Sequence, residues 1–266
     1  MDTKTIKITP DGGVVEVRLA RPEVHNAFDS RLIGELTSAL ETLAADSRCR
    51  VLILSGEGKN FCAGADINWM RESIRFSRKE NEEDALRMHR MLQTLDDFHK
   101  PTVGRIQGAT FGGGVGLIAC CDVAVATDRA TFCLSETRLG ILPAVISPFV
   151  ARKIGVSGLR TYGLSARRFA ADEALRIGLI QESVPPGELD GAVRAWVDLF
   201  LANGPEAMAT LKQLSQEIAY LSPEDASIRT AKTIAGARAG SEGQEGLKAF
   251  LEKRQPGWRN SKKPGT

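Results

Sequence analysis

The chain has 266 residues, of which 42% are hydrophobic and 26% are charged, and its 35 basic and 33 acidic side chains leave a net charge of +2. This length and composition are those of a globular protein with a large core in one or two domains, which excludes a disordered chain and a coiled coil. The near-neutral charge, without any run of more than two neighbouring Lys or Arg residues, predicts no nucleic-acid or membrane partner.

The five cysteines and three histidines lack the spacing of a zinc site or a disulfide framework, so we expect no bound metal. The first residues lead into a polar, strand-like segment without the apolar core of a signal peptide. The longest nearly apolar stretch, 139–151, contains two prolines and is well short of the roughly 18 residues that would span a bilayer. We therefore expect a soluble protein of the cytoplasm.

The N-terminal part of the chain predicts strands that alternate with helices. Hydrophobic residues alternate on both sides of Asp11-Gly12-Gly13, which predicts a hairpin. Asp29 or Ser30 can cap an amphipathic helix, and the apolar run 51–54 is typical of a strand buried on both faces. A second helix ends at Pro101, and another strand follows it.

The second half continues this pattern and then changes. A glycine-rich turn starts a short helix at 112–120, and strands are predicted at 122–126 and 131–134. Strands alternating with helices indicate an α/β fold. From about Pro186 the strand signals stop and four helices follow, so the chain divides into a body, residues 1–195, and a helical tail, residues 196–266.

Two segments carry small residues where a strand ends. In Phe61–Asp66, which follows a buried strand, small residues would let the backbone approach a ligand and present a free N–H. Taken alone, this segment is better explained by a tight turn chosen for packing. In Gly108–Gly116, three consecutive glycines stand where a strand meets a helix N-terminus, which favours a bound ligand or a close helix–sheet contact. The glycine spacing fits neither a dinucleotide fingerprint nor a phosphate loop.

A third segment places a carboxyl group in apolar surroundings. Glu136 follows an apolar strand and precedes the stretch 139–143, so a raised pKa and proton transfer are expected of it. The alternative is a surface ion pair with Arg138. Serine hydrolysis is disfavoured because the chain has no Gly-x-Ser-x-Gly motif.

Together these three segments, in this order and spacing, resemble the crotonase family of enoyl-CoA hydratases and isomerases. The resemblance extends over about residues 5–260. It includes an early loop from Arg21-Pro22 to Phe28 and a C-terminal helix at 245–253. It implies a spiral of stacked ββα units, of the crotonase and ClpP type, with a C-terminal helical domain. It also implies a homotrimer or a hexamer, and an acyl-CoA substrate with no cofactor, since coenzyme A is part of the substrate.

The resemblance also implies roles for individual residues. The N–H groups of Ala65 and Gly113 would form an oxyanion hole for the thioester, and Glu136 would activate water and protonate C2. The amides around Ala63 would lie near the CoA adenine, and Phe250 and Lys253 would meet the CoA of a neighbouring subunit. The other residues expected at the substrate are Asp66, Ile67, Gly112 and Leu139.

Two departures from the family pattern bear on the reaction. Many hydratases carry a first glutamate two residues after the glycine triplet, where this chain has Gly116. The usual Pro-Gly-x-Gly-Gly turn is here Pro143-Ala144-Val145-Ile146-Ser147. We therefore count Gly116 with the catalytic positions. A pattern with a single glutamate also resembles the Δ3,Δ2-enoyl-CoA isomerases of the family. The absence of the first glutamate leaves a further alternative, an acyl-CoA-binding protein without catalysis.

The amino-acid sequences of segments 112–122, 132–136 and 142–148 resemble those of bacterial methylglutaconyl-CoA hydratases of leucine breakdown. They also resemble the isohexenylglutaconyl-CoA counterparts of terpene breakdown. We therefore favour hydration of a branched, carboxyl-bearing enoyl-CoA. Such a substrate needs a cation for its distal carboxylate. The candidates are Arg71, Arg75 and Arg138.

Overall fold

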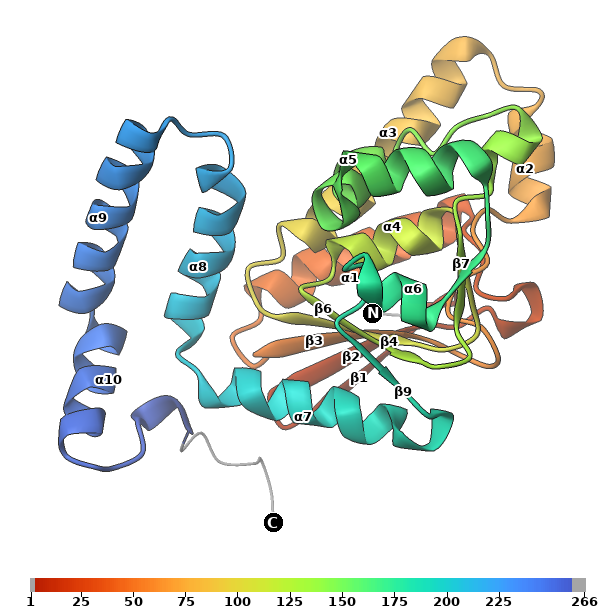
Figure 1. Ribbon diagram of the computed structural model, residues 1–266. Helices are drawn as coiled ribbons and strands as arrows, with labels where there is room; N and C mark the ends of the chain where they lie inside the picture. Colours follow the sequence, from red (N-terminus) through yellow and green to blue (C-terminus); the bar gives the residue numbers. More distant parts are fainter. Residues whose placement is uncertain (1–2, 260–266) are drawn as a thin grey trace.

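Two sheets form the centre of the computed structural model, which describes residues 3–259 (Figure 1). The larger sheet has six strands in the order β1 (Ile6–Asp11), β2 (Val14–Leu19), β3 (Val51–Gly56), β4 (Thr102–Ile106), β6 (Val123–Thr127) and β9 (Glu182–Val184). The smaller sheet has the order β5 (Ala109–Phe111), β7 (Thr131–Cys133) and β8 (Phe169–Ala170). The pairs β1–β2 and β7–β8 are antiparallel, and the other neighbours run parallel.

Helices surround these sheets. They are α1 (Ser30–Ala45), α2 (Ile67–Ser73), α3 (Arg78–Asp96), α4 (Gly113–Cys120), α5 (Ser147–Ser165), α6 (Ala171–Arg176), α7 (Leu189–Ala202), α8 (Pro205–Ile218), α9 (Pro223–Ala239) and α10 (Ser241–Leu251). Short 3-10 turns are η1 (Pro22–Val24), η2 (Glu136–Leu139), η3 (Pro186–Glu188) and η4 (Gly257–Arg259). Strands and helices alternate up to β9, so the expected α/β class is confirmed.

Alternate residues of the larger sheet face two different cores, because successive side chains of a strand point to opposite faces. On β2, Val15 and Val17 join the main core under α1, α3 and α4. Val14 faces the other way and packs with Val193 and Val197 of α7. The two faces of the sheet are therefore covered by different helices.

The termini of the predicted helices follow capping chemistry. Asp29 caps α1, and its carboxylate accepts a hydrogen bond of 2.7 Å from the N–H of Leu32. Ser77 and Glu80 form a capping box at the start of α3. α5 is interrupted at Gly155, whose φ of +73° is not helical. This interruption explains why the apolar periodicity of residues 147–165 does not predict one helix.

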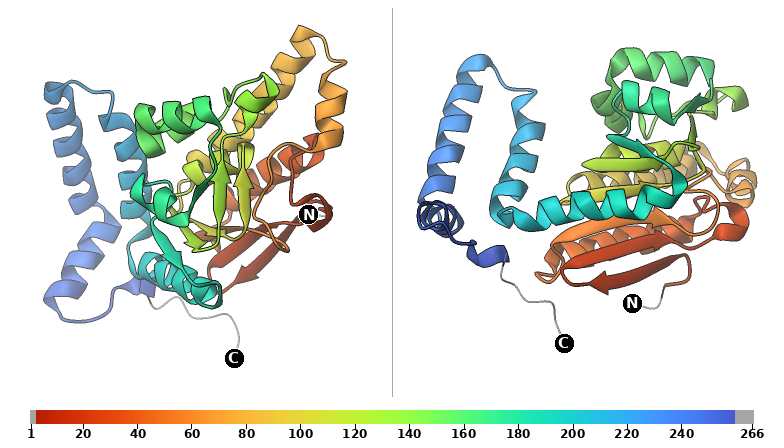
Figure 2. Two further views of the ribbon diagram at one scale, coloured as in Figure 1. Left: turned by 45° about the vertical axis from the view of Figure 1, so that its right-hand side comes forward. Right: turned by 60° about the horizontal axis from the view of Figure 1, so that its bottom comes forward.

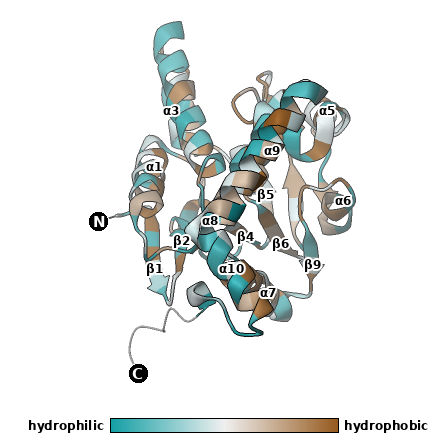
Figure 3. Ribbon diagram, turned by 90° about the vertical axis from the view of Figure 1, so that its left-hand side faces the viewer, coloured by the Kyte–Doolittle hydropathy of each residue, from teal (hydrophilic) through white to brown (hydrophobic). Residues whose placement is uncertain are grey.

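The helices α8, α9 and α10 extend away from the sheets, as Figure 2 shows in two further views. Within the described chain, α8 and α9 contain no buried residue, and α10 contains one, Ala249. Hydrophobic and hydrophilic residues are mixed along their surfaces (Figure 3). The boundary expected between residues 195 and 196 falls inside α7, and residues 1–2 and 260–266 of the two parts lie outside the described residues.

The cysteines lie in the interior of the fold, and all five are free and buried. Among residues 3–259, no helix combines the length and the hydropathy needed to cross a membrane.

Candidate active site

A cavity of about 240 Å³ lies where three segments meet: Phe61–Asp66, Gly108–Gly116 and the segment that contains Glu136. Its lining comes from the loops after β2 and β3, from α2 and α3, from the start of α4, and from the segment between β7 and α5. The lining residues are Phe28, Ala63, Gly64, Ala65, Trp69, Met70, Met88, Gly112, Gly113, Ser135, Glu136, Leu139, Ile141, Leu142, Pro143, Ala144, Val145 and Ile146. Ser135 and Glu136 are the polar members, and Glu136 is the titratable one.

Backbone hydrogen bonds bring the first two segments together. Phe28 donates its N–H to the Gly64 carbonyl at 2.7 Å, and the Asp66 N–H donates to the Phe28 carbonyl at 2.8 Å. On the other side, the Phe111 N–H donates to the Cys62 carbonyl at 2.9 Å. The turn that contains Ala65 is therefore held between the early loop and the segment before α4.

Two backbone N–H groups at this junction are available to a ligand. Among the hydrogen bonds of residues 3–259, none has the N–H of Ala65 or Gly113 as its donor. Gly113 is the first residue of α4, where helical N–H groups have no partner in the helix. A Cβ on Gly113 would lie 2.6 Å from Cε of Met88 and 2.8 Å from Cε2 of Phe28. Glycine is therefore required for this close packing.

Glu136 lines the same cavity as Ala65 and Gly113 and lies beside Gly112. Its Oε1 is 3.0 Å from the point where a Cβ on Gly112 would stand, and Gly112 has a φ of +50°. Its Oε2 is buried and has no hydrogen-bond partner within the described chain. Burial raises the pKa of the Glu136 carboxyl, and the N–H groups of Glu136 and Ser135 lower it by less. A carboxyl with a raised pKa in an apolar cavity is suited to accept and return a proton.

Asp66 and Ile67 are placed beside the cavity but do not line it. The buried Asp66 carboxylate caps α2 through the Asn68 N–H at 2.7 Å and pairs with Arg21 at 2.7 Å. Burial alone would raise the pKa of Asp66, but these two donors lower it below its usual value. Ile67 is 67% exposed. The roles expected of both residues at the substrate stay predictions.

Gly116 is buried in the middle of α4 and is separated from the cavity by Ile146. A Cβ on Gly116 would lie 2.5 Å from Cγ2 of Ile146. Ile146 itself is 2% exposed and lines the cavity. The position expected to carry a second carboxylate in many relatives therefore faces an apolar side chain here.

Other expected binding residues lie away from this cavity. Phe250 of α10 is 81% exposed, and Lys253 follows that helix. Their expected contact with the CoA of a neighbouring subunit stays a prediction. The three cations considered for a distal carboxylate, Arg71, Arg75 and Arg138, are exposed and do not line the cavity. Arg138 donates a hydrogen bond to the Ala166 carbonyl at 2.5 Å.

Several lining residues were not expected from the sequence. Phe28 lies in the early loop after β2 and Met88 on α3, and the sequence predicted a role at the site for neither. Ser135 precedes Glu136 and lines the same cavity. Ile141 and Leu142 are exposed for more than half of their surface. A run of exposed apolar residues directly after a candidate catalytic glutamate is a signal that could have identified these two.

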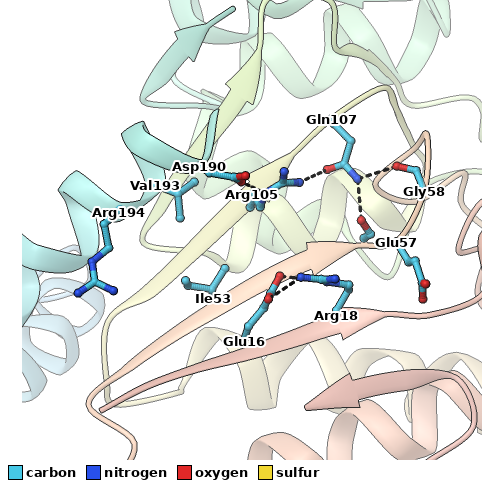
Figure 4. Close-up of a pocket in the computed structure, with 11 residues that line it drawn as sticks. Glu16, Arg18, Ile53, Glu57, Gly58, Arg105, Gln107, Asp190, Val193 and Arg194 are labelled. Carbon is cyan, nitrogen blue, oxygen red and sulfur yellow. Dashed lines mark hydrogen bonds and ion pairs between the residues drawn. The ribbon is translucent and has the colours of Figure 1, made fainter. Parts of the chain in front are cut away.

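A larger cavity, of about 450 Å³, lies on the opposite face of the larger sheet, beside α7 (Figure 4). Four of its charged side chains form two ion pairs within the cavity. Arg18 and Glu16 are 2.7 Å apart, and Arg105 and Asp190 are 2.6 Å apart. Gln107 donates to the Gly56 carbonyl at 2.6 Å. This cavity contains neither an unpaired buried carboxyl nor the free amides of the first one.

No cluster of three or more His, Cys, Asp or Glu side chains in residues 3–259 could hold a metal ion. The cavity around Glu136 is the candidate active site because it combines a buried carboxyl oxygen that has no partner among the described residues with N–H groups that no described residue uses.

Comparisons with known proteins agree on one family. The sequence model of the family Enoyl-CoA hydratase/isomerase matches residues 9–261. A putative enoyl-CoA hydratase of Thermus thermophilus is 30% identical over 245 residues, which are 92% of this chain and 97% of that protein. A probable enoyl-CoA hydratase of Rhodobacter capsulatus is 31% identical over 259 residues, 96% of this chain and 98% of that protein.

Solved structures show the same fold. An enoyl-CoA hydratase from Shewanella pealeana superposes with a TM-score of 0.93 at 42% identity and covers 96% of each chain. Pseudomonas aeruginosa AtuE superposes with a TM-score of 0.93 at 34% identity and covers 97% of this chain and 100% of its own. The expected crotonase-type fold with its C-terminal helices is confirmed.

Proposed function

Because the chain belongs to the enoyl-CoA hydratase/isomerase family, we propose that it adds water across the 2,3 double bond of an enoyl-CoA thioester. The observation that carries this proposal is one cavity that holds the buried Oε2 of Glu136, which has no partner among residues 3–259, together with Ala65 and Gly113, whose N–H groups no described residue uses. Such an arrangement joins a proton-transfer group to donors for a developing oxyanion.

The two amides would bind the thioester carbonyl oxygen. Attack of water at C3 moves the double-bond electrons toward that oxygen and gives an enolate-like state. Donors that are already in place stabilise the charge without reorganising, and one such donor is worth on the order of 3–4 kcal/mol. Gly113 also begins α4, so the positive end of the helix dipole lies at the same point.

Glu136 would carry out both proton transfers of the reaction. Its carboxylate takes a proton from water as the oxygen bonds to C3, and its carboxylic acid returns that proton to C2. The net result is one water added, with hydroxyl at C3 and hydrogen at C2. A pKa raised by burial brings the group closer to the range in which it is an efficient base and then an efficient acid.

For the acyl group, we infer a branched, glutaconyl-type substrate such as 3-methylglutaconyl-CoA. The resemblance of segments 112–122, 132–136 and 142–148 supports it, and the apolar lining suits the hydrocarbon branch. No basic side chain is among the residues that line the cavity. The distal carboxylate would therefore need an exposed cation outside it, such as Arg71, Arg75 or Arg138. A substrate of this type would place the enzyme in leucine or terpene breakdown.

The test compares hydration of 3-methylglutaconyl-CoA, 3-methylcrotonyl-CoA and crotonyl-CoA by the wild type and by Glu136→Gln. The first two substrates share the branch and differ in the carboxylate. We expect a strong preference for the glutaconyl ester and loss of turnover in the variant. Equal rates with the two branched esters would contradict the carboxylate preference, and unchanged turnover in Glu136→Gln would contradict the role of Glu136.

The lone carboxyl of the cavity also favours a second reaction, the isomerisation of a 3-enoyl-CoA with Glu136 as the single base. That reaction moves the double bond without taking up solvent oxygen. Incubation in ¹⁸O-labelled water distinguishes the two, because only hydration incorporates the label. If neither class of substrate is turned over, the remaining alternative is that the protein binds acyl-CoA without catalysing a reaction.

We also propose that the protein forms a trimer or a hexamer through its helical tail. The helices α8–α10 expose large apolar side chains, among them Leu211, Ile228, Leu247 and Phe250. Light scattering coupled to size exclusion measures the mass directly. A monomer at micromolar concentration would contradict this proposal.

A further inference from the structure

Gly116 and Ile146 fill one space between them. They are 30 positions apart in the sequence, on α4 and at the N-cap of α5. A Cβ on Gly116 would lie 2.5 Å from Cγ2 and 3.0 Å from Cβ of Ile146, and 3.5 Å from Cδ2 of Leu92. Contacts below 3.0 Å are not tolerated by real side chains. Any side chain at residue 116 therefore requires Ile146 to move.

Ile146 has little freedom to move. It is 2% exposed, and its carbonyl accepts the hydrogen bond of the Val150 N–H at 3.0 Å as α5 begins. The Ser147 N–H is bonded to the Ala144 carbonyl at 3.2 Å, and Pro148 stands in the first turn of the helix. Its branched side chain touches Gly116 on one side and lines the cavity of Glu136 on the other.

The neighbouring glycine of α4 is constrained in a different way. A Cβ on Gly114 would lie 2.7 Å from the backbone oxygen of Cys62, which no change of side chain can remove. The obstacle at Gly116 consists of the Ile146 and Leu92 side chains. The requirement for glycine at 116 is thus conditional on Ile146, whereas the requirement at 114 is not.

We propose that Ile146 occupies the place of a second acid–base side chain in this site and determines its specificity. With that space filled by a branched hydrocarbon, the cavity contains a single titratable group, Glu136, and presents an apolar wall to the acyl chain. The enzyme therefore performs its chemistry with one carboxyl and takes acyl groups that are apolar where they meet Ile146. The catalytic half of this inference rests on the function proposed above.

The packing half is tested by thermal unfolding, independently of turnover. In the wild type we expect Gly116→Ala to lower Tm by roughly 5 °C, because it overpacks the site. In an Ile146→Ala background the same change should raise Tm, since alanine is the better helix former once space exists. Gly114→Ala is the matched control and should lower Tm in both backgrounds. If Gly116→Ala lowers Tm equally in both backgrounds, Ile146 is not the occupant.

The catalytic half is tested by the pH dependence of kcat/KM. The wild type should show one acidic ionisation, that of Glu136. The double variant Gly116→Glu/Ile146→Gly places a second carboxyl in the cavity and should show two coupled ionisations. Gly116→Gln/Ile146→Gly has the same size without the charge and should return to one. Two ionisations in Gly116→Glu alone, at wild-type Tm, would overturn the proposal.

The two proposals fail in different ways. A wild type that adds no water to any enoyl-CoA refutes the proposed function, while the reversal of the Gly116→Ala effect still decides whether Ile146 fills the space. Hydration by the wild type without that reversal refutes the further inference alone. Both measurements use the full chain.

Discussion

Arg21 and Asp66 form an ion pair, 2.7 Å between Nη2 and Oδ2, that joins the loop after β2 to the residue following Ala65. Only 15% of the Arg21 side chain and 5% of the Asp66 side chain are exposed. Arg21 also donates to the Ala27 carbonyl at 2.6 Å. The pair therefore holds the turn that contains Ala65, a residue that lines the cavity, although neither Arg21 nor Asp66 belongs to that lining.

Loss of this pair should destabilise the fold and misplace the donor. Arg21→Met leaves the Asp66 carboxylate buried without its partner, so we expect the free energy of unfolding to fall by about 3 kcal/mol. The substrate turnover should fall with it, because Ala65 is adjacent. The matched control is Arg48→Met, which removes an ion pair with Asp46 from a side chain that is 90% exposed. Urea unfolding should show little change there.

Glu136→Gln should stabilise the protein while it removes the reaction. Burial raises the pKa of Glu136 in the folded state above its unfolded value. The ionised form therefore destabilises the native state at pH above that raised pKa, and the penalty disappears as pH falls below the usual value of about 4.3. Glutamine has no charge at any pH. We expect a higher Tm than wild type near neutrality and no such gain in acid; a Tm below wild type near neutrality would contradict the burial argument.

The pH–rate profile should show the same group. Hydration needs Glu136 ionised to take the proton from water, so kcat/KM should fall as pH decreases through the raised pKa. The midpoint is expected above about 4.3, the value of an unperturbed glutamate. A midpoint at or below that value would show that the Glu136 carboxyl of the free enzyme is solvated, and would contradict its burial.

The helix α8 is attached to the body through polar contacts, and their removal should release it. Lys212 donates to Asp122 at 2.8 Å, and Gln216 donates to Asp96 at 3.2 Å. Lys212→Met leaves the Asp122 carboxylate without this cation, so we expect faster hydrogen exchange in α8 with the sheets unaffected. The control is Lys79→Met, since Lys79 is 86% exposed and 3.8 Å from Glu83. Equal exchange in both variants would contradict the attachment.

The sequence was informative where local chemistry and spacing decide the structure. The capping of α1 by Asp29, the hairpin of β1 and β2, and the four C-terminal helices follow from turn residues and apolar periodicity. Ala65, Gly113 and Glu136 were predicted on three separate segments, and the structure brings all three to one cavity. Their joint role came from the resemblance, because each segment alone fits a packing explanation.

The sequence was uninformative where distant residues share a space. Gly116 and Ile146 meet only because α4 packs on α5, and no periodicity links residues 30 positions apart. The strands β5 and β8 are three and two residues long, too short for an alternation to be visible. α5 was missed because Gly155 interrupts it, Pro143 shortly precedes it and Pro148 stands in its first turn. In each case tertiary packing, not local propensity, decides the outcome.

The five buried cysteines can report local unfolding of the segments that contain them. Burial raises the pKa of the thiols of Cys62 and Cys121 to about 12 and that of Cys49 to about 11. Thiolates are the reactive form, so alkylating reagents reach these groups only when a segment unfolds. Cys62 lies shortly before Ala65, Cys121 directly follows α4 and Cys49 precedes β3. The order in which they are labelled in the native protein therefore reports which of these segments opens first.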